Sequence, residues 1–177
     1  DYTSNELGHA LRGMLHGNGN YLERVLGATW LRSSELHAPL AELVRRSVLS
    51  RRVIGHYRGF ARSQMRELER APTAKRALYV LRTALTGIHL LATGEMVTDV
   101  TTLLDDHGFA DARELVTRKL EGERVALGDD EARHWLARLE DAFSRLEAAY
   151  ETSVLPEDPP DEPAVSEWLV ATRLARV

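Results

Sequence analysis

The chain has 177 residues, no cysteine and a formal net charge of −4 at pH 7. It contains no apolar run of the roughly 18–20 residues that span a membrane, and without cysteine it has no disulfide framework, thiolate metal site or thiol nucleophile. Because the first residues also lack the basic start and apolar centre of a signal peptide, we expect a cytoplasmic protein with one main domain.

The charge is divided unevenly along the chain. Residues 1–95 hold 14 Lys and Arg against 8 Asp and Glu, whereas residues 96–177 hold 9 against 19. The basic half favours an anionic partner such as a nucleotide or a nucleic acid. The acidic half argues against general coating of duplex DNA, which requires broad neutralisation of phosphates.

Helical periodicity dominates the sequence and predicts an all-α fold of six to eight helices. The β-branched stretch 95–102 is expected to be extended, and the proline-rich, acidic segment from residue 154 is expected to be a linker. We therefore expect a helical domain over 1–153, and a linker with a C-terminal helix that packs back on it over 154–177. The expected helices lie between Asn5 and Gly17, after Asn20, after Ser34, at about 50–70, 73–93, 110–121 and 130–152, and around Trp168.

Two of these helices, between His56 and Glu95, each combine an apolar face with a row of basic side chains. Spacings of three, four and seven residues place the members of each row on one helical face. A face with nearly one sign of charge favours an anionic partner, most often phosphate, although a solvated edge beside a core tyrosine is the alternative. The rows are Arg51, Arg58, Arg62 and Arg66 on the first helix, and Lys75, Tyr79 and Arg82 on the second.

Two glycines, Gly55 and Gly59, lie inside the first of these helices. Glycine in a helix costs roughly 1 kcal/mol relative to alanine, so a compensating contact is expected. Either close packing of a neighbouring helix or the approach of a ligand would supply it.

Arg51 and His56 have the Arg-x(4–6)-His spacing that is typical of the HEPN ribonucleases, where the two side chains handle the scissile phosphate. A pattern this short also arises by chance. A helical ribonuclease that uses these two residues is therefore kept as an alternative hypothesis, as is a non-catalytic interaction domain.

Five short motifs follow one another along nearly the whole chain. They are Gly17-Asn18-Gly19-Asn20 with Leu22-Glu23; His56-Tyr57-Arg58-Gly59 with Ala61 and Gln64; Lys75, Tyr79 and Arg82 with Thr93-Gly94-Glu95; Leu115 through Gly122-Glu123; and Ser153 through Asp161. In this order they resemble the helical, C-terminal part of the predicted nucleotidyltransferases of the DNA polymerase β superfamily, the group linked to RNA repair. The chain departs from that pattern at Gly19, where the family has proline, and at Tyr79, where it has histidine.

The resemblance implies a reaction in which a nucleoside monophosphate passes from a nucleoside triphosphate to a hydroxyl acceptor such as RNA. In that family the helical part closes over a palm domain and clamps the triphosphate. Lys75 and Arg82 would then bind phosphates and Tyr79 would lie beside the nucleotide. The other expected contacts in the same cleft are Tyr57, Arg58 and Gln64.

The family's chemistry also needs palm carboxylates that hold Mg²⁺. The sequence contains neither a Gly-Ser dipeptide nor an Asp-x-Asp pair that a strand would carry. We therefore expect the palm to be supplied by a segment outside this chain, in cis or in trans, and the chain alone to be inactive. Asp1 is the candidate for the third catalytic, metal-binding carboxylate.

Overall fold

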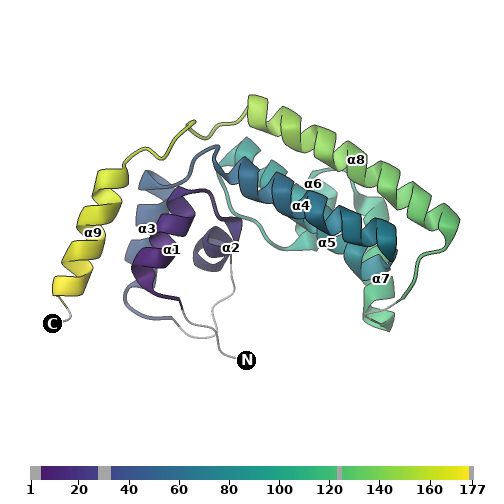
Figure 1. Cartoon of the computed structure of the whole chain (residues 1–177), viewed down its shortest axis with the longest axis horizontal. Helices are drawn as coiled ribbons and strands as arrows, with labels where there is room; N and C mark the ends of the chain where they lie inside the picture. The colour runs from purple at the N-terminus through teal and green to yellow at the C-terminus, as the bar shows by residue number, and fades with distance from the viewer. Residues whose placement is uncertain (1–4, 28–32, 123–124, 176–177) are drawn as a thin grey trace. The chain divides into compact units, whose positions relative to one another are not determined.

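The computed structural model describes residues 5–27, 33–122 and 125–175. Within these ranges the chain forms nine α-helices and no strand, which confirms the all-α prediction and exceeds the expected six to eight helices (Figure 1). The helices are α1 (Leu7–Leu15), α2 (Gly19–Leu22), α3 (His37–Ser47), α4 (Val53–Arg70), α5 (Ala74–Thr93), α6 (Val100–Asp106), α7 (Arg113–Glu121), α8 (Asp129–Glu151) and α9 (Glu162–Leu174). A π-helical turn, Glu23–Gly27, follows α2, and a 3₁₀ turn, Ala110–Ala112, precedes α7. No described helix is both long enough and apolar enough to cross a membrane.

The prediction of an extended stretch over 95–102 is wrong for its last three residues, which belong to α6. Residues 95–99 lack regular structure, and Asp99 then caps the helix by accepting hydrogen bonds from the backbone N–H groups of Thr101 and Thr102 at 2.8 and 3.1 Å. Leu103 and Leu104 are completely buried. The cap and the apolar pair outweigh the lower helix propensity of the β-branched residues.

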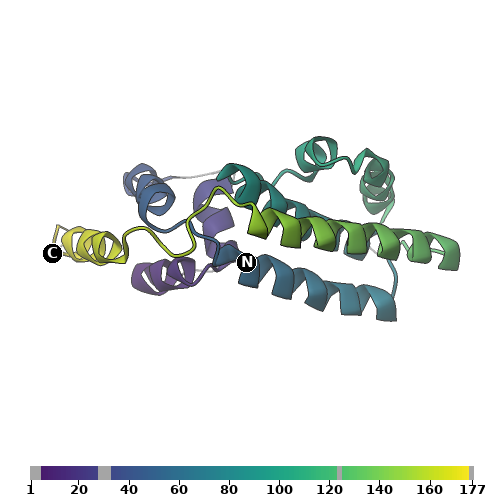
Figure 2. The ribbon, with the colours of Figure 1, turned by 90° about the horizontal axis from the view of Figure 1, so that it is seen from above.

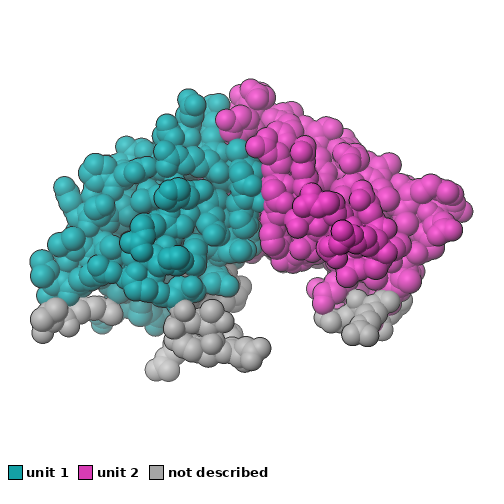
Figure 3. Space-filling model, viewed as in Figure 1, with its two compact units in different colours: residues 1–56, 155–177 teal, residues 57–154 magenta. Residues whose placement is uncertain are grey.

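The chain divides into two compact units (Figure 3). Unit 1 comprises Asp1–His56 and Leu155–Val177, and unit 2 comprises Tyr57–Val154. Unit 1 is thus built from two segments that are distant in sequence, whereas unit 2 is continuous. The expected division of the chain at residue 154 into a domain and an appendage stays a prediction.

Helix α5 is the core of unit 2. Thr73 caps its first turn by accepting from the Arg76 N–H, and Gly94 ends it in the left-handed conformation with φ 76°, as the sequence predicts. The helix contacts α6, α7 and α8, which lie around it in Figures 1 and 2. A Cβ atom added at Gly87 would lie 2.8 Å from Cβ of Tyr57 and 3.0 Å from Cδ1 of Leu146. Glycine therefore permits α5 to approach α4 and α8 closely.

Unit 1 contains α1, α2, α3 and α9, together with the first turn of α4. Helix α9 packs against α1 and α3. The preceding proline-rich segment is fixed by Arg52, which donates to Asp158 at 2.9 Å, to Glu162 at 3.1 Å and to the carbonyl oxygen of Leu15 at 3.2 Å. Asp161 caps α9 by accepting from the Ala164 N–H. The acidic residues of this segment therefore serve to hold the fold together.

Candidate functional site

The structure brings together two of the three side chains predicted to bind nucleotide on α5. The guanidinium carbon of Arg82 lies 5.4 Å from the centroid of the Tyr79 ring, within cation–π range. The Tyr79 ring also meets Phe60 edge-on at 5.9 Å between centroids. Tyr79 remains 39% exposed, and Lys75 is exposed one helical turn earlier. Helix α5 therefore presents an aromatic ring flanked by two cations.

The same face of α5 continues beyond Arg82 with polar residues that the sequence interpretation did not select. Thr86 is completely buried, and its hydroxyl has no hydrogen-bond partner among the described residues. Nδ1 of His89 lies 3.3 Å from Nε2 of His107 on the loop after α6. The pKa of His107 is lowered mainly by burial and, to a smaller extent, by the charge of the neighbouring His89. The helical spacing, with Thr86 four and His89 seven residues after Arg82, was the available signal.

Tyr57, Arg58 and Gln64 lie on α4 but do not form one surface. Tyr57 is completely buried against α5, and its hydroxyl donates to the sulfur of Met96 at 3.7 Å. Arg58 is exposed and Gln64 is half-buried. In this arrangement the Tyr57 ring is a core side chain, and a base could stack on it only if the core opened.

The arginine row of the first cationic helix is interrupted and partly neutralised within the protein. Arg51 precedes α4 and uses its Nε to donate to the carbonyl oxygen of Leu155 at 3.0 Å. Arg58 and Arg62 both approach Glu147 of α8, at 3.4 and 3.9 Å. The expectation of a nearly single-sign face that requires an external anion is therefore wrong for this helix, because α8 supplies a carboxylate.

Gly55 and Gly59 do not pack closely against a neighbour. No described atom lies within 4 Å of a Cβ added at either position, and both residues are exposed. Of the two explanations considered for these glycines, close helix packing is excluded for the structure described.

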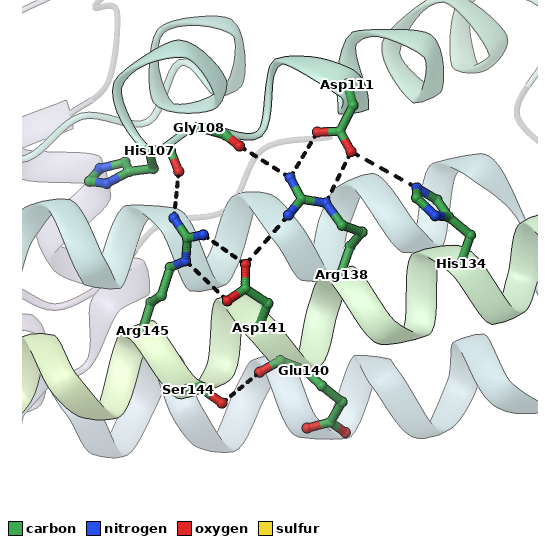
Figure 4. A network of polar contacts seen from close by, with 9 residues as sticks. All are labelled: His107, Gly108, Asp111, His134, Arg138, Glu140, Asp141, Ser144 and Arg145. Atoms are coloured by element: carbon green, nitrogen blue, oxygen red, sulfur yellow. Dashed lines mark hydrogen bonds and ion pairs between the residues drawn. The ribbon is translucent and has the colours of Figure 1, made fainter.

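A second polar cluster in unit 2 joins α8 to the segment between α6 and α7 (Figure 4). Arg138 donates to both carboxylate oxygens of Asp111, at 2.9 and 3.0 Å, and to the carbonyl oxygen of Gly108 at 3.1 Å. Arg145 donates to the carbonyl oxygen of His107 at 3.0 Å. Both guanidinium groups lie over the buried ring of Phe109, at 4.3 and 5.0 Å from its centroid. The donors and acceptors of this cluster bind one another. We therefore interpret the cluster as a structural link between α8 and the segment between α6 and α7, and not as a ligand site.

Unit 1 contains a pocket of about 540 Å³ that the sequence interpretation missed as a site. It lies between α1, the Gly17-Asn18 loop, α2 and the first turn of α4. His9, Arg12 and Gly13 of α1 and its C-cap His16 lie on one helical face, because His9 is three and four residues from Arg12 and Gly13, and His16 is four and three residues from them. This spacing was the available signal. The lining residues are His9, Arg12, Gly13, His16, Gly17, Asn18, Tyr21 and His56. His56 thus borders a pocket, but the Arg51 that the ribonuclease hypothesis pairs with it is not a lining residue.

A metal site is not formed by the residues described. Within 5–27, 33–122 and 125–175, no three His, Asp or Glu side chains are grouped so that they could hold a metal ion. Asp1, the candidate third carboxylate, lies outside the described residues. The groups present therefore do not fit Mg²⁺ by themselves.

Comparisons with known proteins give the family of the chain. An uncharacterized protein of Methanocaldococcus jannaschii, MJ0002, is 33% identical to it over 101 residues, which are 56% of this chain and 41% of that protein. The match thus spans less than half of the length of this curated relative. No solved structure matches the chain. The family model described as RlaP, RNA repair pathway DNA polymerase beta family, matches residues 1–171, and the chain therefore belongs to that family.

Proposed function

We propose that this chain is the helical, substrate-binding part of a nucleotidyltransferase, with RNA as the expected acceptor. Membership of the RNA repair pathway DNA polymerase beta family over residues 1–171 carries the proposal. In the reaction, an acceptor hydroxyl oxygen bonds to the α-phosphorus of a nucleoside triphosphate and loses its proton. The bond from that phosphorus to the bridging oxygen breaks, and pyrophosphate leaves. We expect this activity in the cytoplasm.

The face of α5 is the proposed site for the triphosphate. Lys75 and Arg82 would bind phosphate oxygens through charge-assisted hydrogen bonds. The ring of Tyr79 lies against Arg82 at 5.4 Å and is exposed enough to lie beside the nucleoside. Arg58 and Gln64 on α4 are the further proposed contacts, whereas Tyr57 would act by supporting α5 from the core.

The proposed reaction also needs carboxylates that hold Mg²⁺. Because the described residues contain no metal-binding cluster, we assign Mg²⁺ to carboxylates of a palm segment supplied in cis or in trans. Asp1 is the residue of this chain with a proposed place in that set. The work proposed for the helical part is to bind and orient the triphosphate.

The test measures the binding of Mg²⁺–ATP to this chain and to the variant Lys75→Ala/Arg82→Ala. Binding is monitored through amide chemical shifts, because these report affinities in the millimolar range. Hydrogen bonds to charged groups are worth about 1.5–3 kcal/mol each, so the variant should bind at least about tenfold more weakly. The matched control is Lys119→Ala/Arg133→Ala, which removes two exposed cations of the same unit that belong to α7 and α8 and not to α5. Equal affinities of the two variants would remove α5 from the site.

A further inference from the structure

We propose that the pocket of unit 1 binds a phosphorylated ribonucleotide, through residues different from those assigned to the triphosphate. The choice of a ribonucleotide rests on the proposed function, while the choice of a phosphate rests on the pocket itself. The residues that would make the contacts are Arg12, His9, His16, Asn18, Tyr21 and His56.

Two glycines give the pocket its shape. A Cβ added at Gly13 would lie 2.6 Å from the Tyr21 ring, so that the ring can rest directly over the backbone of α1 only because residue 13 is glycine. Gly17 has φ 76°, and a Cβ there would lie 2.4 Å from the carbonyl oxygen of Arg52. The loop can therefore approach the start of α4, which carries His56. The shape of the pocket therefore depends on glycine at both positions.

The charge of the lining selects an anion. Arg12 and three histidines line the pocket, and no carboxylate among the described residues does. The guanidinium of Arg12 has no hydrogen-bond or ion-pair partner in the described parts of the chain. An arginine with five unused N–H donors beside imidazole rings is suited to the oxygens of a phosphate group.

The hydrogen bonds already present leave further groups for a ligand. Nδ1 of His16 lies 2.7 Å from the carbonyl oxygen of Arg12, so Nδ1 carries the hydrogen and donates it to this oxygen. Nε2 of the neutral ring is then left as an acceptor for a hydroxyl group of the ligand. Oδ1 of Asn18 accepts from the N–H of Asn20 at 3.0 Å and thereby caps α2, which leaves the side-chain amide nitrogen as a donor. The Gly17-Asn18-Gly19-Asn20 motif thus builds the pocket and contributes to its lining.

The size and the aromatic rings indicate a ligand larger than a phosphate ion. A volume of about 540 Å³ falls within the roughly 300–1,000 Å³ of small-molecule sites. The rings of His9 and Tyr21 meet edge-on at 6.0 Å between centroids, and Tyr21 is only half-buried. A half-exposed aromatic face beside phosphate donors can stack on a base. A free mononucleotide and the phosphorylated end of an RNA strand share this chemistry.

The experiment measures binding of AMP, adenosine and a 5′-phosphorylated tetraribonucleotide to the whole chain, with histidine ring resonances as the local reporter. We expect adenosine to bind at least about tenfold more weakly than AMP, and Arg12→Ala to lose a similar factor for AMP. Arg46→Ala is the matched control, because Arg46 is an exposed arginine of α3 in the same unit and does not line the pocket. Gly13→Ala should weaken binding without removing charge.

Each outcome decides a different point. Equal binding of AMP and adenosine, or equal losses in Arg12→Ala and Arg46→Ala, would overturn the proposal. A tetranucleotide that binds at least about tenfold tighter than AMP identifies a strand end as the ligand, whereas equal affinities identify a free mononucleotide. RNA cleavage that is lost in His56→Ala would replace the proposal by a ribonuclease. AMP-induced shifts of the lining histidines that persist in Lys75→Ala/Arg82→Ala separate this pocket from the triphosphate site.

Discussion

Helices α1 and α4 each carry an exposed arginine next to a glycine, Arg12-Gly13 and Arg58-Gly59, yet the two pairs differ in what surrounds them. On α4, Arg58 and Arg62 approach Glu147 of the same unit, and the Gly59 position is open. On α1, Arg12 has no acidic partner among the described residues, and Gly13 is enclosed by a tyrosine ring. A row of basic residues along one helix therefore does not identify a binding site until the acidic residues of neighbouring helices are known.

The largest expected effect is that of Gly17→Ala. The left-handed backbone conformation costs a non-glycine residue about 1–2 kcal/mol, and the new Cβ would also lie 2.4 Å from a carbonyl oxygen. We expect the free energy of unfolding to fall by at least about 2 kcal/mol, measured by urea denaturation. A loss below about 0.5 kcal/mol would show that the pocket wall can move freely. The glycines around α1 would then be no more constrained than Gly59 of α4.

Gly59→Ala should have the opposite sign. The added Cβ meets no described atom within 4 Å, and alanine is a better helix former by roughly 0.5–1 kcal/mol. We expect a gain in unfolding free energy of about that size, by the same denaturation measurement. If the stabilised variant also binds Mg²⁺–ATP less well than the wild type, the open glycine is reserved for a ligand.

Arg58→Ala/Arg62→Ala should change little. Ion pairs between exposed side chains contribute about 0–1 kcal/mol, and these side chains are 46% and 60% exposed. We expect a stability change within about 1 kcal/mol and an unchanged affinity for AMP. Loss of AMP binding in this variant, with Arg12 intact, would move the proposed AMP site from the pocket of unit 1 to α4.

A small pH effect is expected at the start of α1. The backbone N–H groups of Gly8 and His9 first, and then Arg173 of α9, lower the pKa of Glu6 from 4.5 to about 2. Because the unfolded chain binds the proton more readily, the stabilisation is full above pH 4.5 and is lost as the pH falls towards 2. The difference in thermal midpoint between wild type and Glu6→Gln should thus be present at pH 6 and shrink at pH 3. A difference that stays constant would exclude the ionised cap as its cause.

The sequence predicts those features that depend on neighbouring residues. The start of α5 at Thr73 and its end at Gly94 follow from a capping hydroxyl and from a residue that tolerates positive φ. Helix α6 was missed because its β-branched residues suggested extended chain, whereas the side chain of Asp99 and the burial of two leucines decide its conformation.

The site was less predictable, because it depends on residues that are distant in sequence. The juxtaposition of Tyr79 and Arg82 follows from helical spacing, but the burial of Tyr57 depends on Gly87, thirty positions later. The pocket of unit 1 requires a contact between Gly17 and the backbone at Arg52. The motif around Asn18 was recognised by resemblance, and only the structure shows that it lines a pocket.

The discontinuity of unit 1 has a consequence for the order in which the protein is completed during synthesis. Arg52, whose carbonyl oxygen limits the position of Gly17, is itself fixed by Asp158 and Glu162. Unit 2 is a single stretch of chain, so it can fold as soon as residue 154 has left the ribosome. The contacts of Arg52 with Asp158 and Glu162 form only after that point. Helices α1 and α3 therefore acquire their contacts with α9 only after the whole of unit 2 has been synthesised.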